Sequence, residues 1–179
     1  LLHYTHHSPT RVFHLSDTPT AIGKLFAKPL GKLVFDDDTS AIVYRGDSST
    51  VMLVGQGDRV ARVSVLCSVL CGCLQALQAL RKHNLIFRDV EELKASVAVT
   101  AAGKVKLLGA HAVKYAKEMP SEAYIVGQIA LLAEAAVSGR PEKWAVEREL
   151  ALRVCKDLHE IKTVAAAEKR LSLSSGKHR

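Results

Sequence analysis

The chain has 179 residues, 48% hydrophobic and 24% charged, with a formal net charge of +7 at pH 7. This composition is typical of one ordinary globular domain, and no internal repeat is visible. Four cysteines, three of them within residues 67–73, do not form the framework of a secreted disulfide protein, so we expect an intracellular, reducing compartment. No apolar run reaches the roughly 18 residues that a bilayer span requires, and we therefore expect no membrane span.

Residues 1–20 lack hydrophobic periodicity and are rich in His, Ser and Thr, which predicts an extended arm that becomes ordered only against something else. Its histidines have no cysteine or carboxylate at ligand spacing, so we predict no metal site at His3, His6, His7 and His14. Up to Ser16 the chain holds no acidic residue, which is typical of the sequence near a mitochondrial transit peptide. A chain that begins inside a longer protein would look the same.

Residues 21–58 predict a small β-rich part. Thr18 or Thr20 is a candidate N-cap for a short helix over residues 21–27, and Pro29 and Gly31 end that helix. Strands are predicted at residues 33–35, 41–44 and 50–54, separated by an acidic turn and by the turn Arg-Gly-Asp-Ser-Ser.

A long helix and a hairpin follow. Apolar residues recur every three or four positions from Val63 to Leu80, which predicts an amphipathic helix with Asn84 as its C-cap. Cys67 and Cys71 share one face of this helix, and their apolar neighbours favour buried thiols over a zinc site. After a loop, residues 97–99 and 105–108 predict two strands joined by a turn at Ala102-Gly103.

Two further helices are predicted in the second half of the chain. The first covers residues 121–138, with start signals at Pro120 and Ser121 and a stop at residues 139–141. The second covers residues 144–168 and is amphipathic, with a predicted core stripe of Val146, Leu150, Leu152 or Val154, Leu158, Ile161 and Val164.

This order of elements resembles the C-terminal lobe of a eukaryotic-type protein kinase. The segment LRKHNLIFRDVEELKASVAVTAAGKVKLLGAH is similar to the family's helix end, catalytic loop and hairpin before the magnesium-binding Asp-Phe-Gly. The segment PSEAYIVGQIALLAEAAVSGRP is similar to the family's central buried helix, with Glu122 in place of the aspartate that ties down the catalytic loop. The positions that agree there are Ser121, Tyr124, Gly127, Glu134, Gly139 and Pro141.

The resemblance covers about residues 40–165 and implies an α+β, minimal protein-kinase-like fold with a small β hairpin region and a mainly helical C-lobe. It divides the chain into an arm (1–20), a reduced N-lobe (21–58), a C-lobe (59–168) and a basic tail (169–179). Residues 55–58 then fall at the hinge between the lobes, the glycine-rich loop is absent or unrecognisable, and the activation segment is cut to about residues 112–121.

The resemblance also implies that the catalytic motifs are degenerate. Arg88 and Asp89 stand where the family's catalytic Arg and Asp stand, whereas Gly109 replaces the magnesium-binding Asp of Asp-Phe-Gly. Phe87 replaces the catalytic-loop His, and Glu91 replaces its Lys.

The family's second magnesium ligand, an Asn, falls near Lys94 or Ser96. Without both metal ligands, and with Glu91 repelling phosphate, we expect no ATP-magnesium binding and no cofactor. Asp89 is then predicted to be structural, pairing with Arg88 or capping backbone amides.

These features favour a non-catalytic structural or scaffold subunit of a large assembly, such as a mitochondrial ribonucleoprotein, over a stand-alone docking module or a residual ATP-dependent enzyme. The expected partners are other protein subunits and the RNA backbone, which would be bound electrostatically and with strong salt dependence. The candidate contacts are the basic residues near both ends, Arg11, Lys24, Lys28, Lys32, Lys169, Arg170, Lys177 and Arg179.

Overall fold

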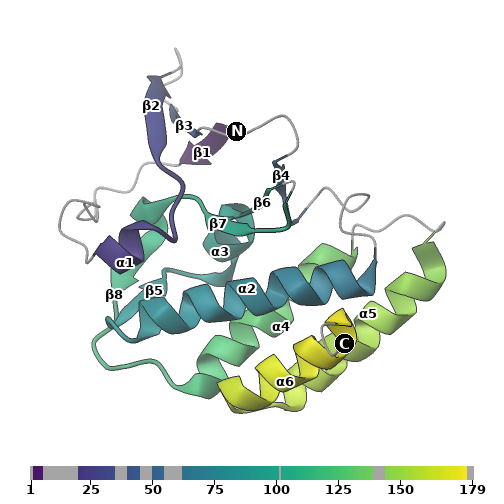
Figure 1. Cartoon of the computed structure of the whole chain (residues 1–179). Coiled ribbons are helices and arrows are strands. Elements are labelled where there is room, and N and C mark those ends of the chain that lie inside the picture. Colours follow the sequence, from purple (N-terminus) through teal and green to yellow (C-terminus); the bar gives the residue numbers. More distant parts are fainter. Residues whose placement is uncertain are drawn as a thin grey trace.

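A small β-rich part lies over a helical layer in the computed structural model (Figure 1). The structure describes residues 2–5, 20–34, 40–44, 50–54, 62–100, 102–138 and 144–176. Its helices are α1 (Thr20–Gly23), α2 (Val63–Arg81), α3 (Val90–Ser96), α4 (Glu122–Ser138), α5 (Ala145–Glu160) and α6 (Val164–Ser175), with a 3-10 turn at Ala110–Ala112. Its strands are β1 (Leu2–Thr5), β2 (Pro29–Val34), β3 (Ser40–Tyr44), β4 (Val51–Met52), β5 (Leu85–Phe87), β6 (Val97–Val99), β7 (Val105–Leu107) and β8 (Val113–Tyr115).

The strands form three small sheets. The first is antiparallel in the order β1-β3-β2, the second has the order β4-β6-β7, and β5 pairs with β8. Strand β1 falls within the predicted extended arm, and its residues pair with β3 of the same chain, Leu2 opposite Val43 and Thr5 opposite Ser40. Residues 2–5 therefore belong to the first sheet and are extended against another strand of the same chain.

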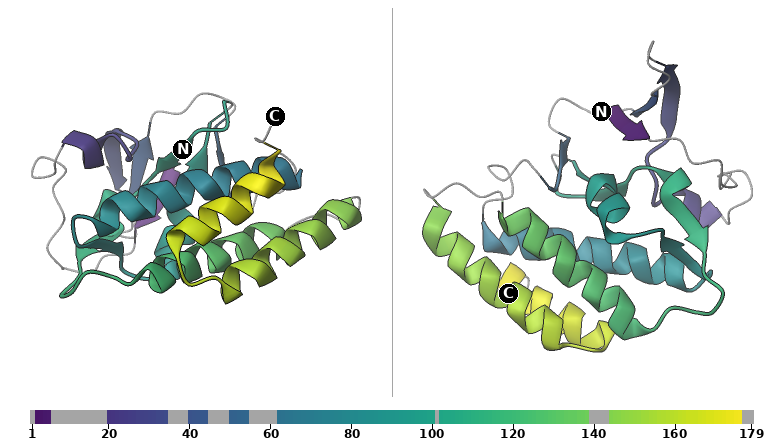
Figure 2. Two further views of the ribbon diagram at one scale, coloured as in Figure 1. Left: turned by 60° about the horizontal axis from the view of Figure 1, so that its bottom comes forward. Right: turned by 180° about the vertical axis from the view of Figure 1, so that it is seen from behind.

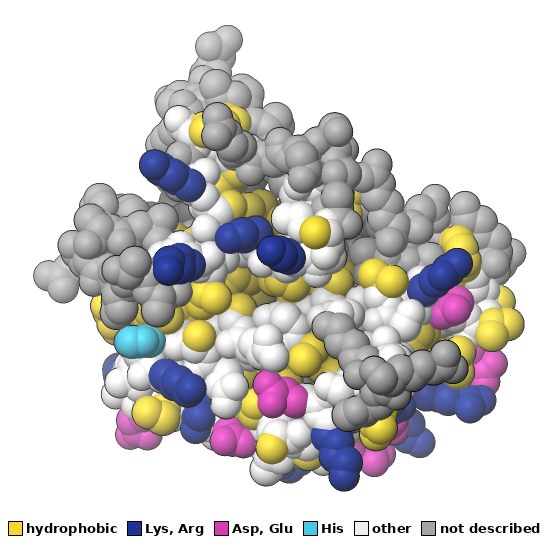
Figure 3. Space-filling model, in the orientation of Figure 1, with side chains coloured by type: hydrophobic (Ala, Val, Ile, Leu, Met, Phe, Trp, Pro, Cys, Tyr) yellow, Lys and Arg dark blue, Asp and Glu magenta, His cyan; other side chains and the backbone are white. Residues whose placement is uncertain are grey.

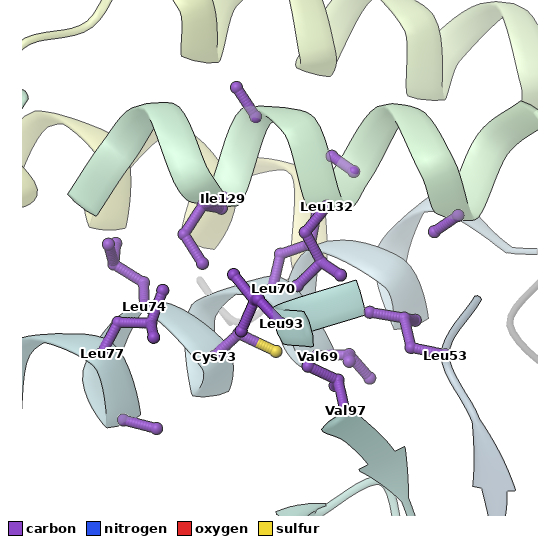
Figure 4. Packing of buried hydrophobic residues seen from close by; sticks show 14 of the residues in the cluster. Leu53, Val69, Leu70, Cys73, Leu74, Leu77, Leu93, Val97, Ile129 and Leu132 are labelled. Carbon is purple, nitrogen blue, oxygen red and sulfur yellow. The ribbon is translucent and has the colours of Figure 1, made fainter. Parts of the chain in front are cut away.

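Helix α2 forms the centre of the core, as its periodicity predicts. Its buried side chains recur along one broad face, and Figure 4 shows Leu70 and Leu74 turned toward Ile129 and Leu132 of α4. Such a three-to-four spacing buries one stripe of a helix against its neighbours, and each fully buried leucine contributes about 1.5–3 kcal/mol. The buried residues of α2 are Val63, Leu66, Cys67, Val69, Leu70, Cys73, Leu74, Ala76, Leu77 and Leu80.

Both ends of α2 are held by other parts of the chain. The backbone N–H of Val63 donates to Oε2 of Glu147 at 2.6 Å, so a carboxylate from α5 caps the N-terminus. After the C-cap residue Lys82, the expected cap Asn84 adopts the left-handed conformation, with φ of 56°. Asparagine tolerates this region better than most residues, which lets the chain turn into β5.

The expectation that no apolar run has the length of a bilayer span is wrong for α2. This helix has 19 residues and an 18-residue window with a mean hydropathy of 1.9, which is long and apolar enough to cross a membrane by length and composition alone. However, 56% of that window is buried inside the fold, as in the core helix of a globular domain.

The predicted hairpin is present, but the loop before it contains an additional helix. Residues 97–99 and 105–107 pair antiparallel, with Val97 opposite Leu107 and Val99 opposite Val105. Residues 90–96, expected as loop, form α3, which inserts Leu93 fully into the core. A helix of seven residues is too short to show a clear periodic pattern in the sequence. Short helices are marginal by themselves, and the burial of Leu93 in the core stabilises this one.

The single helix predicted over residues 144–168 is two helices. Helix α5 ends at Glu160, Ile161 is extended, and the hydroxyl of Thr163 accepts the N–H of Ala166 at the start of α6. Helix α6 then lies along α2 (Figure 2) and continues to Ser175. The tail predicted to begin at residue 169 is therefore helical over its first seven positions.

The core stripe predicted for this region is only partly right. Val154, Leu158 and Val164 are buried, whereas Val146 is 73% exposed and Leu150 and Leu152 are also exposed. The buried side of α5 contains the small Ala151 and the thiol of Cys155 instead. Apolar residues occupy several faces of α5, so periodicity could not decide which face packs.

Candidate functional site

The loop after β5 carries the residues that resemble the kinase catalytic loop. Phe87 is buried, and the backbone N–H of Arg88 donates to the carbonyl of Ala112 at 2.9 Å. The Asp89 side chain accepts the N–H of Glu92 at 2.9 Å and is the N-cap of α3. An aspartate is among the best residues for this position because its carboxylate satisfies an unpaired backbone N–H. Asp89 thus has the capping role predicted for it.

Gly109, which stands where the family carries a magnesium-binding aspartate, has a left-handed backbone with φ of 67° and ψ of 55°. Glycine adopts this conformation without strain, whereas other L-residues incur a cost of roughly 1–2 kcal/mol. The backbone N–H of Gly109 donates to the hydroxyl of Tyr44 at 2.8 Å, and the contact is buried. The 3-10 turn at Ala110–Ala112 follows directly.

Tyr44 joins the upper sheet to the hairpin. It is the last residue of β3, is only 5% exposed, and packs in one cluster with Ala98 of β6 and Leu108. Ala27 and Met52 pack against the same cluster. Burial raises the pKa of the Tyr44 hydroxyl, and the hydrogen bond from Gly109 partly opposes this shift. The hydroxyl therefore stays protonated near neutral pH, and the aromatic ring fills the junction beside Gly109.

Helix α3 carries Glu91 and Ser96, two of the positions at which the kinase motif is degenerate. The Glu91 carboxylate is 76% exposed and lies 2.7 Å from Nζ of Lys94. Its charge is solvated and paired with a lysine, which is a surface arrangement of small energetic value. Ser96 is fully buried, its carbonyl accepts the N–H of Leu108, and its hydroxyl has no partner among the described residues.

Helix α4 contributes two groups whose roles the sequence left undefined. Glu122 was expected where the family aspartate ties down the catalytic loop, but its Oε2 accepts the N–H of Val164 at 2.9 Å. It therefore caps α6 instead. Tyr124 accepts a hydrogen bond from Gln128 at 3.3 Å, and its pKa is raised by burial and then by the negative charge of Asp89.

Those predicted basic contacts whose side chains the structure describes do not form one surface. Lys24 and Lys28 are exposed beside β7, whereas Lys169 is exposed on α6. Arg170 binds Asp157 at 2.6 Å and also contacts the hydroxyl of Ser174, so the fold already uses its guanidinium. Lys32 is placed only as backbone in β2, and the remaining three candidates, Arg11, Lys177 and Arg179, lie outside the described residues.

Sequence reasoning missed Tyr44. The only local signal was one aromatic residue at the end of a short apolar strand, which many structural tyrosines share. Its partner Gly109 lies 65 residues away, so no pattern along the chain could connect the two.

Comparisons with protein-family models and with curated proteins find no match for this chain. Among solved structures, a similar one is a divergent kinase lacking the glycine-rich loop, which regulates membrane ultrastructure of the Toxoplasma parasitophorous vacuole. The TM-score is 0.53 and the sequence identity 17%, over 87% of this chain and 61% of that one. The chain thus spans less than two thirds of that protein, and identity this low shows the fold alone. Together with the helical lobe and the β6–β7 hairpin, this likeness shows that the chain has a protein-kinase-like α+β fold.

Proposed function

We propose that this protein is a non-catalytic kinase-like module that serves as a structural subunit of a larger assembly. The observation that carries the proposal is the buried contact between Tyr44 and Gly109. Magnesium requires oxygen ligands, usually carboxylates, beside the triphosphate. At the position that resembles the family's aspartate the chain has a glycine without a side chain, and its N–H donates to the hydroxyl of a tyrosine from β3.

The remnants of the catalytic loop support the same proposal. Asp89 is the one candidate base that remains, and its carboxylate is engaged as the cap of α3. A cap is a sufficient structural reason for an aspartate at this position. A kinase-like lobe without a nucleotide site still offers a rigid helical surface, and such surfaces bind partners.

The solved neighbour adds support of a limited kind. It is described as a divergent kinase lacking the glycine-rich loop, and this chain has no recognisable glycine-rich loop in its reduced N-lobe. The likeness indicates that a kinase-like fold can form without that loop.

A thermal-shift experiment with Mg-ATP tests the catalytic part of the proposal. A ligand present at 100 times its Kd stabilises a fold by about 2.7 kcal/mol, which would raise Tm by several degrees. We expect no shift with millimolar Mg-ATP. The matched variant is Asp89→Asn, which keeps a capping side chain but lacks a carboxylate. A rise in Tm that this variant abolishes would refute the proposal and restore the residual enzyme.

Sedimentation of the endogenous protein from gently lysed cells tests the assembly part. We expect the chain, followed by mass spectrometry, in a large particle, and a free small species would contradict this. Ribonuclease treatment then distinguishes the two forms of the proposal. A particle that collapses contains RNA, as in the mitochondrial ribonucleoprotein suggested by composition, whereas a resistant particle is a protein assembly.

A further inference from the structure

Four lysines gather around the β6–β7 hairpin. The segment after α1 runs beside β7, because the N–H of Leu107 donates to the carbonyl of Leu25 at 3.0 Å and the N–H of Ala27 donates to Leu107 at 2.8 Å. In this parallel pairing Phe26 lies opposite Leu107, which places Lys24 beside β7, and Nζ of Lys106 donates to the carbonyl of Lys24 at 3.1 Å. Lys28 follows on the same segment, just beyond the paired residues. Lys24, Lys28, Lys104 and Lys106 together are called the lysine rim.

The lysine rim carries positive charge that the described part of the chain does not neutralise. Lys24, Lys28 and Lys104 are exposed and Lys106 is half-buried, and no described carboxylate forms an ion pair with any of them. Figure 3 shows Lys and Arg side chains gathered on this face, with no Asp or Glu visible between them. Like charges placed together repel one another, and an anionic partner relieves that repulsion.

A pocket of about 440 Å³ opens between α2 and the hairpin, with Lys104 in its wall. Leu25, Ala76 and Val105 give it apolar surface, whereas Ser68 and Gln75 provide polar groups. Gly72 allows the hairpin to approach α2 closely, because a Cβ there would lie only 3.0 Å from Cγ2 of Val105. The pocket therefore combines apolar surface with Lys104 of the lysine rim at its wall, and the other rim lysines lie around the same hairpin. An apolar centre beside charged groups is the anatomy of a protein docking site.

We propose that this surface binds an acidic segment of a partner protein, with an apolar side chain of that segment in the pocket and its carboxylates on the lysine rim. Because the lysine rim is positive, charge complementarity requires a negatively charged partner. RNA fits the pocket less well, because its lining contains no aromatic side chain on which a base could stack. The four cations are also all lysines, without the arginine fork that binds phosphate at two points. The inference rests on the role as a subunit of a larger assembly proposed above, and it specifies the chemistry of the partner.

Fluorescence anisotropy with the full chain tests the inference. The probe is a pool of short synthetic peptides with Asp or Glu at alternate positions and Leu, Ile or Phe at the centre. A matched pool carries Asn and Gln instead of Asp and Glu. We expect the acidic pool to bind, the neutral pool to bind at least about tenfold more weakly, and the difference to shrink as salt is raised.

Two variants and a control locate the binding. The triple change Lys24→Gln, Lys28→Gln and Lys104→Gln should weaken binding by about tenfold, since each lost rim charge contributes a modest factor. Gln75→Trp fills the mouth of the pocket and should weaken binding without changing net charge. The control triple, Lys82→Gln, Lys114→Gln and Lys117→Gln, removes three exposed lysines outside this surface and should leave affinity within about twofold.

Equal binding of both pools, or full affinity in the lysine-rim triple variant, would overturn the inference. A single-stranded oligouridine that binds through the same lysines while the acidic peptides do not would overturn it in favour of RNA. The proposed function fails separately, through a response to Mg-ATP. If the chain bound both the peptides and Mg-ATP, the proposed docking surface would stand and only the proposal that the protein is non-catalytic would fail.

Discussion

Replacing Tyr44 with phenylalanine removes only the hydroxyl that receives the N–H of Gly109. The ring remains in its cluster with Ala98 and Leu108, so the change removes the buried hydrogen bond of 2.8 Å and keeps the apolar packing. Gly109 is buried, and its N–H would be left without this acceptor. A buried donor that loses its acceptor costs about 1–3 kcal/mol. For a chain of this length, each kcal/mol corresponds to about 2–4 °C in Tm.

Urea denaturation of the wild type and Tyr44→Phe measures this cost directly, and amide hydrogen exchange at Gly109 should become faster in the variant. Tyr124→Phe is the matched control, because the Tyr124 hydroxyl belongs to a residue that is 39% exposed and accepts only a 3.3 Å bond. We expect the control to change stability by less than about 0.5 kcal/mol. If Tyr44→Phe were as stable as this control, the hydroxyl would not hold β3 against Gly109, and this contact would no longer support the proposed non-catalytic role.

Four further predictions use urea denaturation as the assay. Asp89→Ala should cost about 1 kcal/mol by removing the α3 cap while Asp89→Asn should cost little, and equal losses would argue against a capping role. Gly109→Asp should lose about 1–3 kcal/mol because the position is buried and left-handed, and it should not gain Mg-ATP affinity in calorimetry. Glu122→Ala should lose about 1–2 kcal/mol by uncapping α6, and an unchanged midpoint would contradict this. Burial raises the pKa of Cys73 from 9.0 to about 12, so the folded state keeps a proton that the unfolded state releases above pH 9. Stability should therefore fall by about 1.4 kcal/mol per pH unit above pH 9 through this thiol, and Cys73→Ala should show a shallower slope.

Much of the helical lobe could be predicted from the sequence. The spacing of apolar residues from Val63 to Leu80 predicted α2, although its C-cap is Lys82 and not the expected Asn84, and residues 121–138 predicted α4 within one residue. The hairpin at residues 97–107 followed from two β-branched runs around a glycine turn. These predictions are correct because the backbone geometry of helices and strands imposes a periodic pattern on nearby residues.

The break between α5 and α6 was not predictable in the same way. Residues 161–163 contain no proline or glycine, so nothing in the chain marked them as a helix end. The N–H of Val164 finds an acceptor only because Glu122 lies beside it in the fold, 42 residues away in sequence. A tertiary contact of this kind decides where a helix starts, and it cannot be read from the helix propensities of the residues.

The sequence by itself determined the fold class, the order of the main elements and the loss of a carboxylate at Gly109. The tertiary structure alone decided that Tyr44 packs against that glycine, that Glu122 caps α6, and that Lys24 lies beside Lys106. The physical reason is the distance along the chain over which each kind of interaction acts. Hydrophobic periodicity and turn chemistry act within a few residues, whereas the candidate sites consist of groups brought together across 42 to 82 positions by packing of the core.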